Sequence, residues 1–175
     1  MKTNIRVKNA LAKKKFFEFL QGAKGFTEKS INTFGEAIFQ WEEFMEHDNF
    51  ANFNKTKALD FVRHLKEREA KTESGHLALQ TQYNYLRRVK KFFSWLADQP
   101  GYKSCVNKND AEFLRLSKKE ARIATSGTTR RMPTFKEVKK LIEEIEIKDA
   151  LDRRDRAIIC LALTTGMRIW KEGEW

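Results

Sequence analysis

The 175-residue chain has few of the residues that mark tight turns, disulfides or metal sites. Two prolines and eight glycines are too few for an all-β fold or a low-complexity chain. The two cysteines, Cys105 and Cys160, are far apart in the sequence and have no His nearby, so neither a disulfide framework nor a zinc site is expected. This composition predicts an all-α protein of a reducing cytoplasm, and we expect it to need neither metal nor cofactor.

Long apolar runs are also missing. The basic start, MKTNIRVKNALAKKKFFEFL, is never continuously apolar, and the uncharged stretch 157–167 is far too short to cross a bilayer. Hydrophobic residues nevertheless make up 41% of the chain and aromatic residues 12%, enough to bury a core. We therefore expect a folded cytoplasmic protein without a membrane partner.

The net charge of +11 is concentrated in two blocks. Residues 1–30 carry +6 and residues 71–131 carry +8, whereas residues 31–70 carry −3 and residues 132–175 are neutral. Such clustering is typical of proteins that bind a polyanion, most often nucleic acid, although a solvated basic face without a partner would give the same balance.

Apolar spacing predicts several amphipathic helices. The clearest covers 27–46, with Thr27 as N-cap and an apolar stripe at spacings of 3, 4, 3 and 4: Ile31, Phe34, Ile38, Trp41 and Met45. Short helices are predicted over 11–20 and 110–116. A helix from about Thr56 is predicted to bury Leu59, Val62 and Leu65, and one from about 75 to 96 to bury Leu86, Val89, Phe93 and Leu96. Near the end of the chain, a Thr134–Glu137 capping box predicts the start of a helix, and another helix is predicted over 153–163 with Gly166 at its end. The 153–163 helix is so apolar that we expect it to be deeply buried.

These elements divide the chain into a helical domain (1–116), a basic linker (117–133) and the start of a second domain (134–175). The linker sequence is SKKEARIATSGTTRRMP, and its Arg130 and Arg131 are candidate DNA contacts. The apolar faces of 135–145 and 157–163 need cover, which self-association or packing onto the first domain would supply.

One helix face suits nucleic acid. Five polar residues share one side of the 76–97 helix, and no acidic residue occurs from 77 to 97: Gln80, Asn84, Arg87, Arg88 and Lys91. Amides can bind base edges and cations can bind phosphates, so this face predicts insertion into a DNA groove. Thr27, Lys29 and Ser30, at the start of the 27–46 helix, are weaker candidates for phosphate contacts. Any exposed helix has a polar face, and that interpretation stays open here.

The segment DRAIICLALTTGMRI (155–169) resembles the opening of the catalytic domain of tyrosine recombinases, the phage and mobile-element integrases. In that family an apolar helix leads into Thr-Gly-x-Arg, whose arginine is the first of the catalytic set, so the resemblance gives this role to Arg168. The order of segments also resembles the family, which has a SAM-like core-binding domain, a linker and a helix opening like MPTFKEVKKLIEEI. The resemblance implies a SAM-like helical bundle that binds double-stranded DNA, with protomers assembled on the paired half-sites of a recombination site. When bound to DNA, the protein is expected in the nucleoid.

The family chemistry is the attack of a tyrosine on a DNA phosphodiester, with guanidinium groups stabilising the charge. The other catalytic residues of the family lie downstream of the first arginine, but only seven residues follow Arg168 here, and all tyrosines and histidines precede it. The final WKEGEW also departs from the family and suggests a truncated, frameshifted or artificial end. We therefore expect these residues to bind DNA without cutting it. A helical DNA-binding regulator descended from a recombinase, or a basic module that binds an acidic protein, remain the alternatives.

Overall fold

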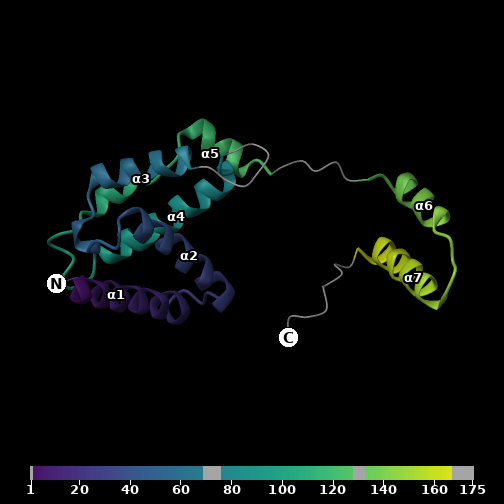
Figure 1. Cartoon of the computed structure of the whole chain (residues 1–175), viewed down its shortest axis with the longest axis horizontal. Helices are drawn as coiled ribbons and strands as arrows, with labels where there is room; N and C mark the ends of the chain where they lie inside the picture. The colour runs from purple at the N-terminus through teal and green to yellow at the C-terminus, as the bar shows by residue number, and fades with distance from the viewer. Residues whose placement is uncertain (1, 69–75, 128–132, 167–175) are drawn as a thin grey trace. The chain divides into compact units, whose positions relative to one another are not determined.

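The computed structural model describes residues 2–68, 76–127 and 133–166, and the secondary structure of these ranges is helical (Figure 1). The chain divides into two compact units, residues 1–127 and 128–175. The first unit contains α1 (Lys2–Gly22), α2 (Glu28–Phe44), α3 (Lys55–Glu67), α4 (Leu79–Leu96) and α5 (Lys118–Thr125), with the 3₁₀ helices η1 (Phe50–Asn52) and η2 (Lys108–Phe113). The second contains α6 (Phe135–Glu144) and α7 (Ala150–Thr165). The predicted all-α class is confirmed, and no helix within the described ranges is both long and apolar enough to span a bilayer.

Helix α4 is the centre of the first unit. It contacts α1, α2, α3, α5 and η2, and in Figure 1 it lies between the α1–α2 pair and α3. Its predicted inward stripe is confirmed, because Leu86, Val89, Phe93 and Leu96 are all buried. Phe92 is buried as well and widens the stripe, so that α4 is covered on more than one side.

The core around α4 is built largely of aromatic rings. The Phe93 ring stacks on Phe53 with 3.9 Å between ring centroids and meets Trp41 edge-on at 4.9 Å. Trp41 in turn meets Phe61 of α3 at 5.0 Å, and Phe50 meets Phe92 at 5.0 Å. Edge-to-face and offset contacts of this kind have definite geometry, so they fix how the helices are rotated as well as how closely they approach.

Two buried polar contacts attach α1 to the rest of the unit. The Asn9 side chain is 1% exposed; its Nδ2 donates to the Asp48 carbonyl at 2.9 Å and its Oδ1 accepts from the Phe50 N–H at 3.2 Å. Lys13 Nζ lies 2.6 Å from the largely buried Glu42 carboxylate of α2. Buried polar groups are tolerated where they are paired in this way, and these pairs make the position of α1 specific.

The predicted inward face of α3 is wrong in part. Leu59 is 43% exposed, whereas the buried residues are Ala58, Phe61 and Leu65. The helix begins at Lys55, after the N-cap Asn54, and the large Phe61 ring takes the position facing Trp41. Burying Phe61 turns the neighbouring Leu59 toward solvent.

The predicted linker 117–133 contains a packed helix, α5, in its first half. Ser117 and Glu120 form a capping box at its start, Ala124 is buried, and the helix contacts α4. Glu120 also accepts a hydrogen bond from Lys66 of α3 at 2.7 Å. An eight-residue helix with little apolar surface gives almost no periodic signal, so sequence reasoning missed it.

In the second unit the predicted start of α6 and the predicted end of α7 are confirmed, whereas α7 begins at Ala150 and not near Arg153. Thr134 and Glu137 form the expected capping box of α6, and Gly166 ends α7 with φ +66°, a conformation that favours glycine. The expected deep burial of α7 is wrong, since none of its side chains is buried and Leu161 is 52% exposed. Helix α6 contacts α7 within the unit, and one neighbouring helix can cover only one side of it.

The aromatic core gives a direct test of stability. Phe93→Ala should lower the free energy of unfolding by about 3–5 kcal/mol, because it removes a fully buried ring and leaves a cavity. Phe39→Ala is the matched control, since Phe39 is 49% exposed and its loss should cost less than about 1 kcal/mol. Urea unfolding followed by circular dichroism measures both, and similar losses in the two variants would contradict the packing described.

The α3–α5 contact gives a pH dependence. The hydrogen bonds from Lys66 and from Ser117 lower the pKa of Glu120 from 4.5 to about 2. The ionised carboxylate therefore stabilises the fold fully above about pH 4.5, and this stability is lost as the pH falls toward 2. Glu120→Gln should cost about 1 kcal/mol near pH 6, and the difference from wild type should shrink as the pH is lowered. Urea unfolding across the pH range measures this, and a difference independent of pH would count against the ion pair.

Candidate nucleic-acid interface

The start of α2 is held by its own hydroxyl groups. Thr27 is the N-cap, as predicted; its Oγ1 accepts from the Ser30 N–H at 3.4 Å and donates to the Ser30 Oγ at 3.1 Å. Thr33 Oγ1 donates to the Ser30 carbonyl at 2.7 Å. The first-turn N–H groups and the helix dipole make such an end favourable for an anion.

A groove of about 420 Å³ lies between this end of α2 and the middle of α4. Arg87, Arg88 and Lys91 of α4 line it opposite residues at or just before the first turns of α2, which are Phe26, Ser30, Thr33 and Phe34. The fold thus brings Ser30 together with three cations that lie more than fifty positions away in the sequence. We call these seven residues the α2–α4 groove.

Lys91 is held in this groove over aromatic rings. Its Nζ lies 4.4 Å from the centroid of the Phe26 ring and 5.4 Å from that of Phe34. Burial lowers the pKa of Lys91, and the nearby charges of Lys24 and Arg87 lower it further. The ring faces partly compensate this cost, because a cation over an aromatic face is attracted by the ring quadrupole.

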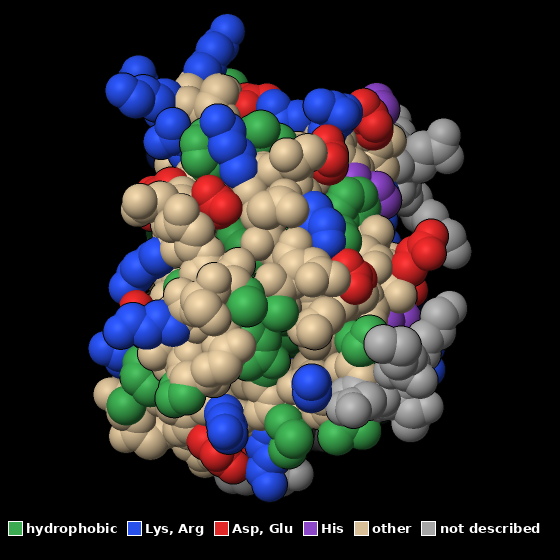
Figure 2. Space-filling view, turned by 90° about the vertical axis from the view of Figure 1, so that its left-hand side faces the viewer, with side chains coloured by type: hydrophobic (Ala, Val, Ile, Leu, Met, Phe, Trp, Pro, Cys, Tyr) green, Lys and Arg blue, Asp and Glu red, His purple; other side chains and the backbone are tan. Residues whose placement is uncertain are grey.

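The cations of the groove have no carboxylate partner in the part of the chain that the structure describes. Among the described residues, no Asp or Glu oxygen lies within 4.0 Å of the charged groups of Arg87, Arg88 or Lys91. The neighbouring Lys90, by contrast, pairs with Glu112 at 2.7 Å. On the face that Figure 2 shows, Lys and Arg side chains are interspersed with Asp and Glu, so positive residues alone do not locate an interface. An unpaired cluster facing a helix N-terminus is a more specific signal for an anion.

Only some of the predicted site residues line the groove. Ser30, Arg87, Arg88 and Lys91 line the groove, Thr27 positions Ser30, and Lys29 is exposed in the first turn of α2. Gln80 is exposed and Asn84 half-buried on the preceding turns of α4, outside the groove lining. Arg130, Arg131 and Arg168 lie outside the described residues.

Four further residues at the groove were missed by sequence reasoning, and one of them is Thr33 in the second turn of α2. Phe26 and Phe34 form its aromatic wall, and Lys24 lies close enough to affect the charge of Lys91. Phe34 was assigned to the core stripe alone, whereas Lys24 and Phe26 lie in the loop between α1 and α2, where no periodicity applies. A cluster of Lys, Gly and Phe directly before an N-cap was the signal available.

Comparison with known proteins identifies the family. Residues 14–99 match the model described as the phage integrase, N-terminal SAM-like domain. This range is therefore an N-terminal SAM-like domain of the phage integrase family. The matched range extends from within α1 to just beyond α4, so the whole α2–α4 groove lies inside this integrase domain. The resemblance drawn from the sequence is confirmed, and so is its SAM-like helical fold.

Two curated relatives extend the similarity beyond the integrase domain. The chain is 26% identical over 159 residues to the tyrosine recombinase XerC of Bacillus subtilis (strain 168), covering 89% of this chain and 47% of that protein. It is also 26% identical over 157 residues to the XerC of Bacillus pumilus (strain SAFR-032), covering 88% and 46%. The chain thus spans about half the length of these relatives, and no solved structure matches it.

The effect of the Lys91 charge on the free energy of unfolding can be measured. Lys91→Met keeps the packing on Phe26 and Phe34 but removes the buried charge and its repulsion by Arg87, so it should raise the free energy of unfolding by about 0.5 kcal/mol at neutral pH. Lys90→Met makes the same change at the next position but loses the pair with Glu112, so it should lower stability by up to about 1 kcal/mol. Urea unfolding of both variants distinguishes their signs, and a clear destabilisation by Lys91→Met would refute this account of the groove.

Proposed function

We propose that this chain is the DNA-binding N-terminal part of a site-specific tyrosine recombinase and that the α2–α4 groove contacts the DNA backbone. The proposal depends on one observation: Arg87, Arg88 and Lys91 face the N-terminus of α2, and none of them pairs with a carboxylate of a described residue. A phosphodiester would supply the missing negative charge. It would also release condensed counterions from the DNA, which is the main source of affinity in such complexes.

Each group in the groove has a distinct part in this proposal. Arg87 and Arg88 bind phosphate oxygens through their planar guanidinium groups, which can donate two parallel hydrogen bonds. Ser30 and the first-turn N–H groups of α2 hold an adjacent phosphate at the positive end of the helix. Lys91, already partly desolvated, gives up little further hydration when an anion approaches.

The face of α4 that carries the cations also carries two amide side chains that can bind bases. Gln80 lies eleven positions before Lys91, about 16 Å along the helix axis, and Asn84 lies between them. With the cations bound to the backbone, these amides are the α4 groups that would meet base edges in the major groove. Sequence preference therefore depends on Gln80 and Asn84, and general affinity depends on the cations.

The remainder of the chain fits a two-part recombinase. We propose that the binding domain extends through α5 to residue 127, that Arg130 and Arg131 in the following segment also contact DNA, and that residues 134–175 begin the catalytic domain with Arg168 as its first arginine. The XerC relatives are named as tyrosine recombinases, which supports this order of parts. On this proposal the protein acts in the cytoplasm on nucleoid or mobile-element DNA, with protomers assembled on paired half-sites.

Two adjacent lysines test the DNA interface. Lys91→Met should weaken binding to any duplex about three- to tenfold at moderate salt and should reduce the slope of log affinity against log salt by about 0.9, the loss of one phosphate contact. Lys90→Met, with the same change in charge, should leave both quantities nearly unchanged because Lys90 is already paired. Fluorescence anisotropy with a labelled duplex over a series of salt concentrations measures both.

Two results would contradict the proposal. A flat salt dependence of the wild-type chain would exclude binding through several phosphates. Equal losses in the Lys90 and Lys91 variants would show that net charge matters and the groove does not. The double variant Arg87→Gln/Arg88→Gln extends the series, with an expected further reduction in salt slope of about two phosphate contacts.

A further inference from the structure

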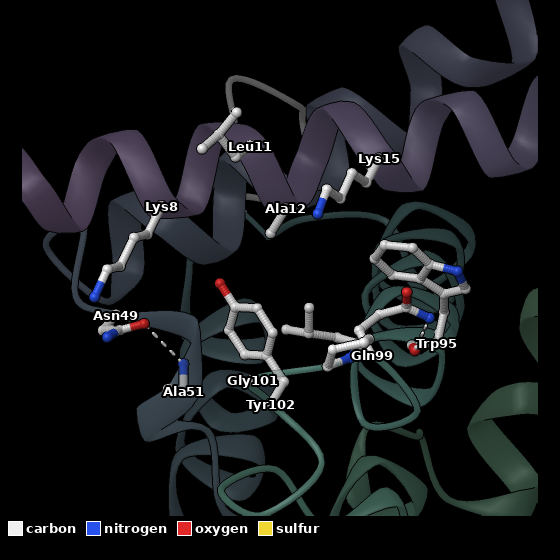
Figure 3. A pocket seen from close by; sticks show the side chains of 12 residues that line it. Lys8, Leu11, Ala12, Lys15, Asn49, Ala51, Trp95, Gln99, Gly101 and Tyr102 are labelled. Carbon is white, nitrogen blue, oxygen red and sulfur yellow. Dashed lines mark hydrogen bonds between the residues drawn. The ribbon is translucent and has the colours of Figure 1, made fainter.

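A second groove, on the other side of α1 from the Lys13–Glu42 ion pair, differs chemically from the α2–α4 groove. It encloses about 350 Å³ between α1, η1 and the segment after α4, and it shares no lining residue with the α2–α4 groove. Its floor and walls are mostly apolar and are formed by Leu11, Ala12, Ala51, Trp95, Pro100 and Tyr102. We call it the α1 groove (Figure 3).

The polar groups of this groove fall into two kinds. Asn49 and Gln99 are engaged within the protein, since Asn49 Oδ1 accepts from the Ala51 N–H at 3.0 Å and Gln99 Nε2 donates to the Trp95 carbonyl at 3.2 Å. Tyr102 is different: its ring stands in the middle of the groove with the hydroxyl toward α1 (Figure 3), and that hydroxyl has no hydrogen-bond partner among the described residues. The hydroxyl is protonated at neutral pH and can donate a hydrogen bond, and burial raises the pKa of Tyr102 further above that range.

Two lysines of α1 border this groove. Lys8 and Lys15 are both exposed, and neither forms an ion pair with a described residue. In Figure 3 the Lys15 side chain extends from α1 into the opening between Tyr102 and Trp95. They are seven residues apart on one face of the helix, about 10 Å along its axis. The described residues that line the groove include no Asp or Glu.

From these features we infer that the α1 groove binds an acidic protein segment whose anchor is one or two adjacent bulky apolar side chains. A recess of this size admits a Phe or Leu side chain, which gains free energy by leaving water for an apolar pocket. Carboxylates on either side of the anchor would meet Lys8 and Lys15. Val7, which is 53% exposed, extends the apolar surface along α1 beyond Leu11 and enlarges the area that such a segment would cover.

DNA suits this groove less well. A phosphodiester backbone is charged along its whole length, and placing it against an apolar recess would remove hydration without supplying hydrogen bonds in return. Only the two lysines would contact it, and the aromatic floor would stay empty. The combination of an apolar floor with two cations at its edge therefore favours an amphipathic acidic peptide over a nucleic acid.

A short peptide tests this inference on the intact chain. The probe is a fluorescein-labelled peptide of sequence Glu-Asp-Phe-Leu-Asp-Glu, and its binding is followed by anisotropy. Lys15→Gln should weaken binding about fivefold or more, whereas Lys14→Gln, on the neighbouring exposed position of α1 beside Glu18, should leave it unchanged. A peptide with Ala in place of Phe and Leu should lose at least tenfold in affinity, because the anchor is gone.

Several outcomes would overturn the inference. No binding of the probe at about 100 μM, a concentration that detects even weak complexes, would remove the site. Equal effects of the Lys14 and Lys15 variants, or equal binding of the Ala peptide, would show non-specific attraction to a basic protein. Loss of duplex binding by Lys15→Gln as large as that by Lys91→Met would assign this surface to DNA. Unchanged urea midpoints for the Lys14 and Lys15 variants confirm folding, and retained duplex binding keeps this test separate from that of the proposed DNA interface.

Discussion

The packing of α4 against the aromatic core is the constraint on which the rest of the first unit depends. The stack of Phe93 on Phe53 and its edge contact with Trp41 allow one rotation of α4 about its axis. Because side chains of a helix advance by about 100° per residue, the rotation that buries Phe93 also directs Arg87 and Lys91 to the groove. Core and candidate interface are thus two consequences of one packing arrangement.

The α2–α4 groove holds positive charges close together, and no carboxylate of the described ranges pairs with its three cations. Burial raises the free-energy cost of charging Lys91, and repulsion by Lys24 and Arg87 adds to that cost. The contacts of Lys91 Nζ with the rings of Phe26 and Phe34 offset part of this cost. The remaining cost lowers the net stability of the folded domain. Such an arrangement is expected where a site is selected for an anionic partner, because the partner relieves a strain that the free protein must bear.

Much of the fold could be predicted from the sequence because long helices leave strong periodic signals. The stripes of α2 and α4 and the caps at Thr27, Thr134 and Gly166 are all confirmed. Prediction failed where tertiary packing decides: Phe61 displaces Leu59 from the core, and the apolar α7 has too few neighbours to bury it. At the site, residues on one helix could be grouped, but the approach of α2 to α4 and the loop residues Lys24 and Phe26 depend on contacts between distant segments.

The contacts of α5 indicate which fragment of the chain can fold independently. The family match ends at residue 99, directly after α4, yet α5 contacts α4 and its Glu120 binds Lys66 of α3. Leu114 and Leu116, just before α5, are buried in the same core. The range matched by the family model, 14–99, is therefore shorter than the range that supplies all residues of the hydrophobic core. An autonomous fragment for crystallisation or spectroscopy should end after residue 127, since a cut at the homology boundary would expose the far side of α4 to water.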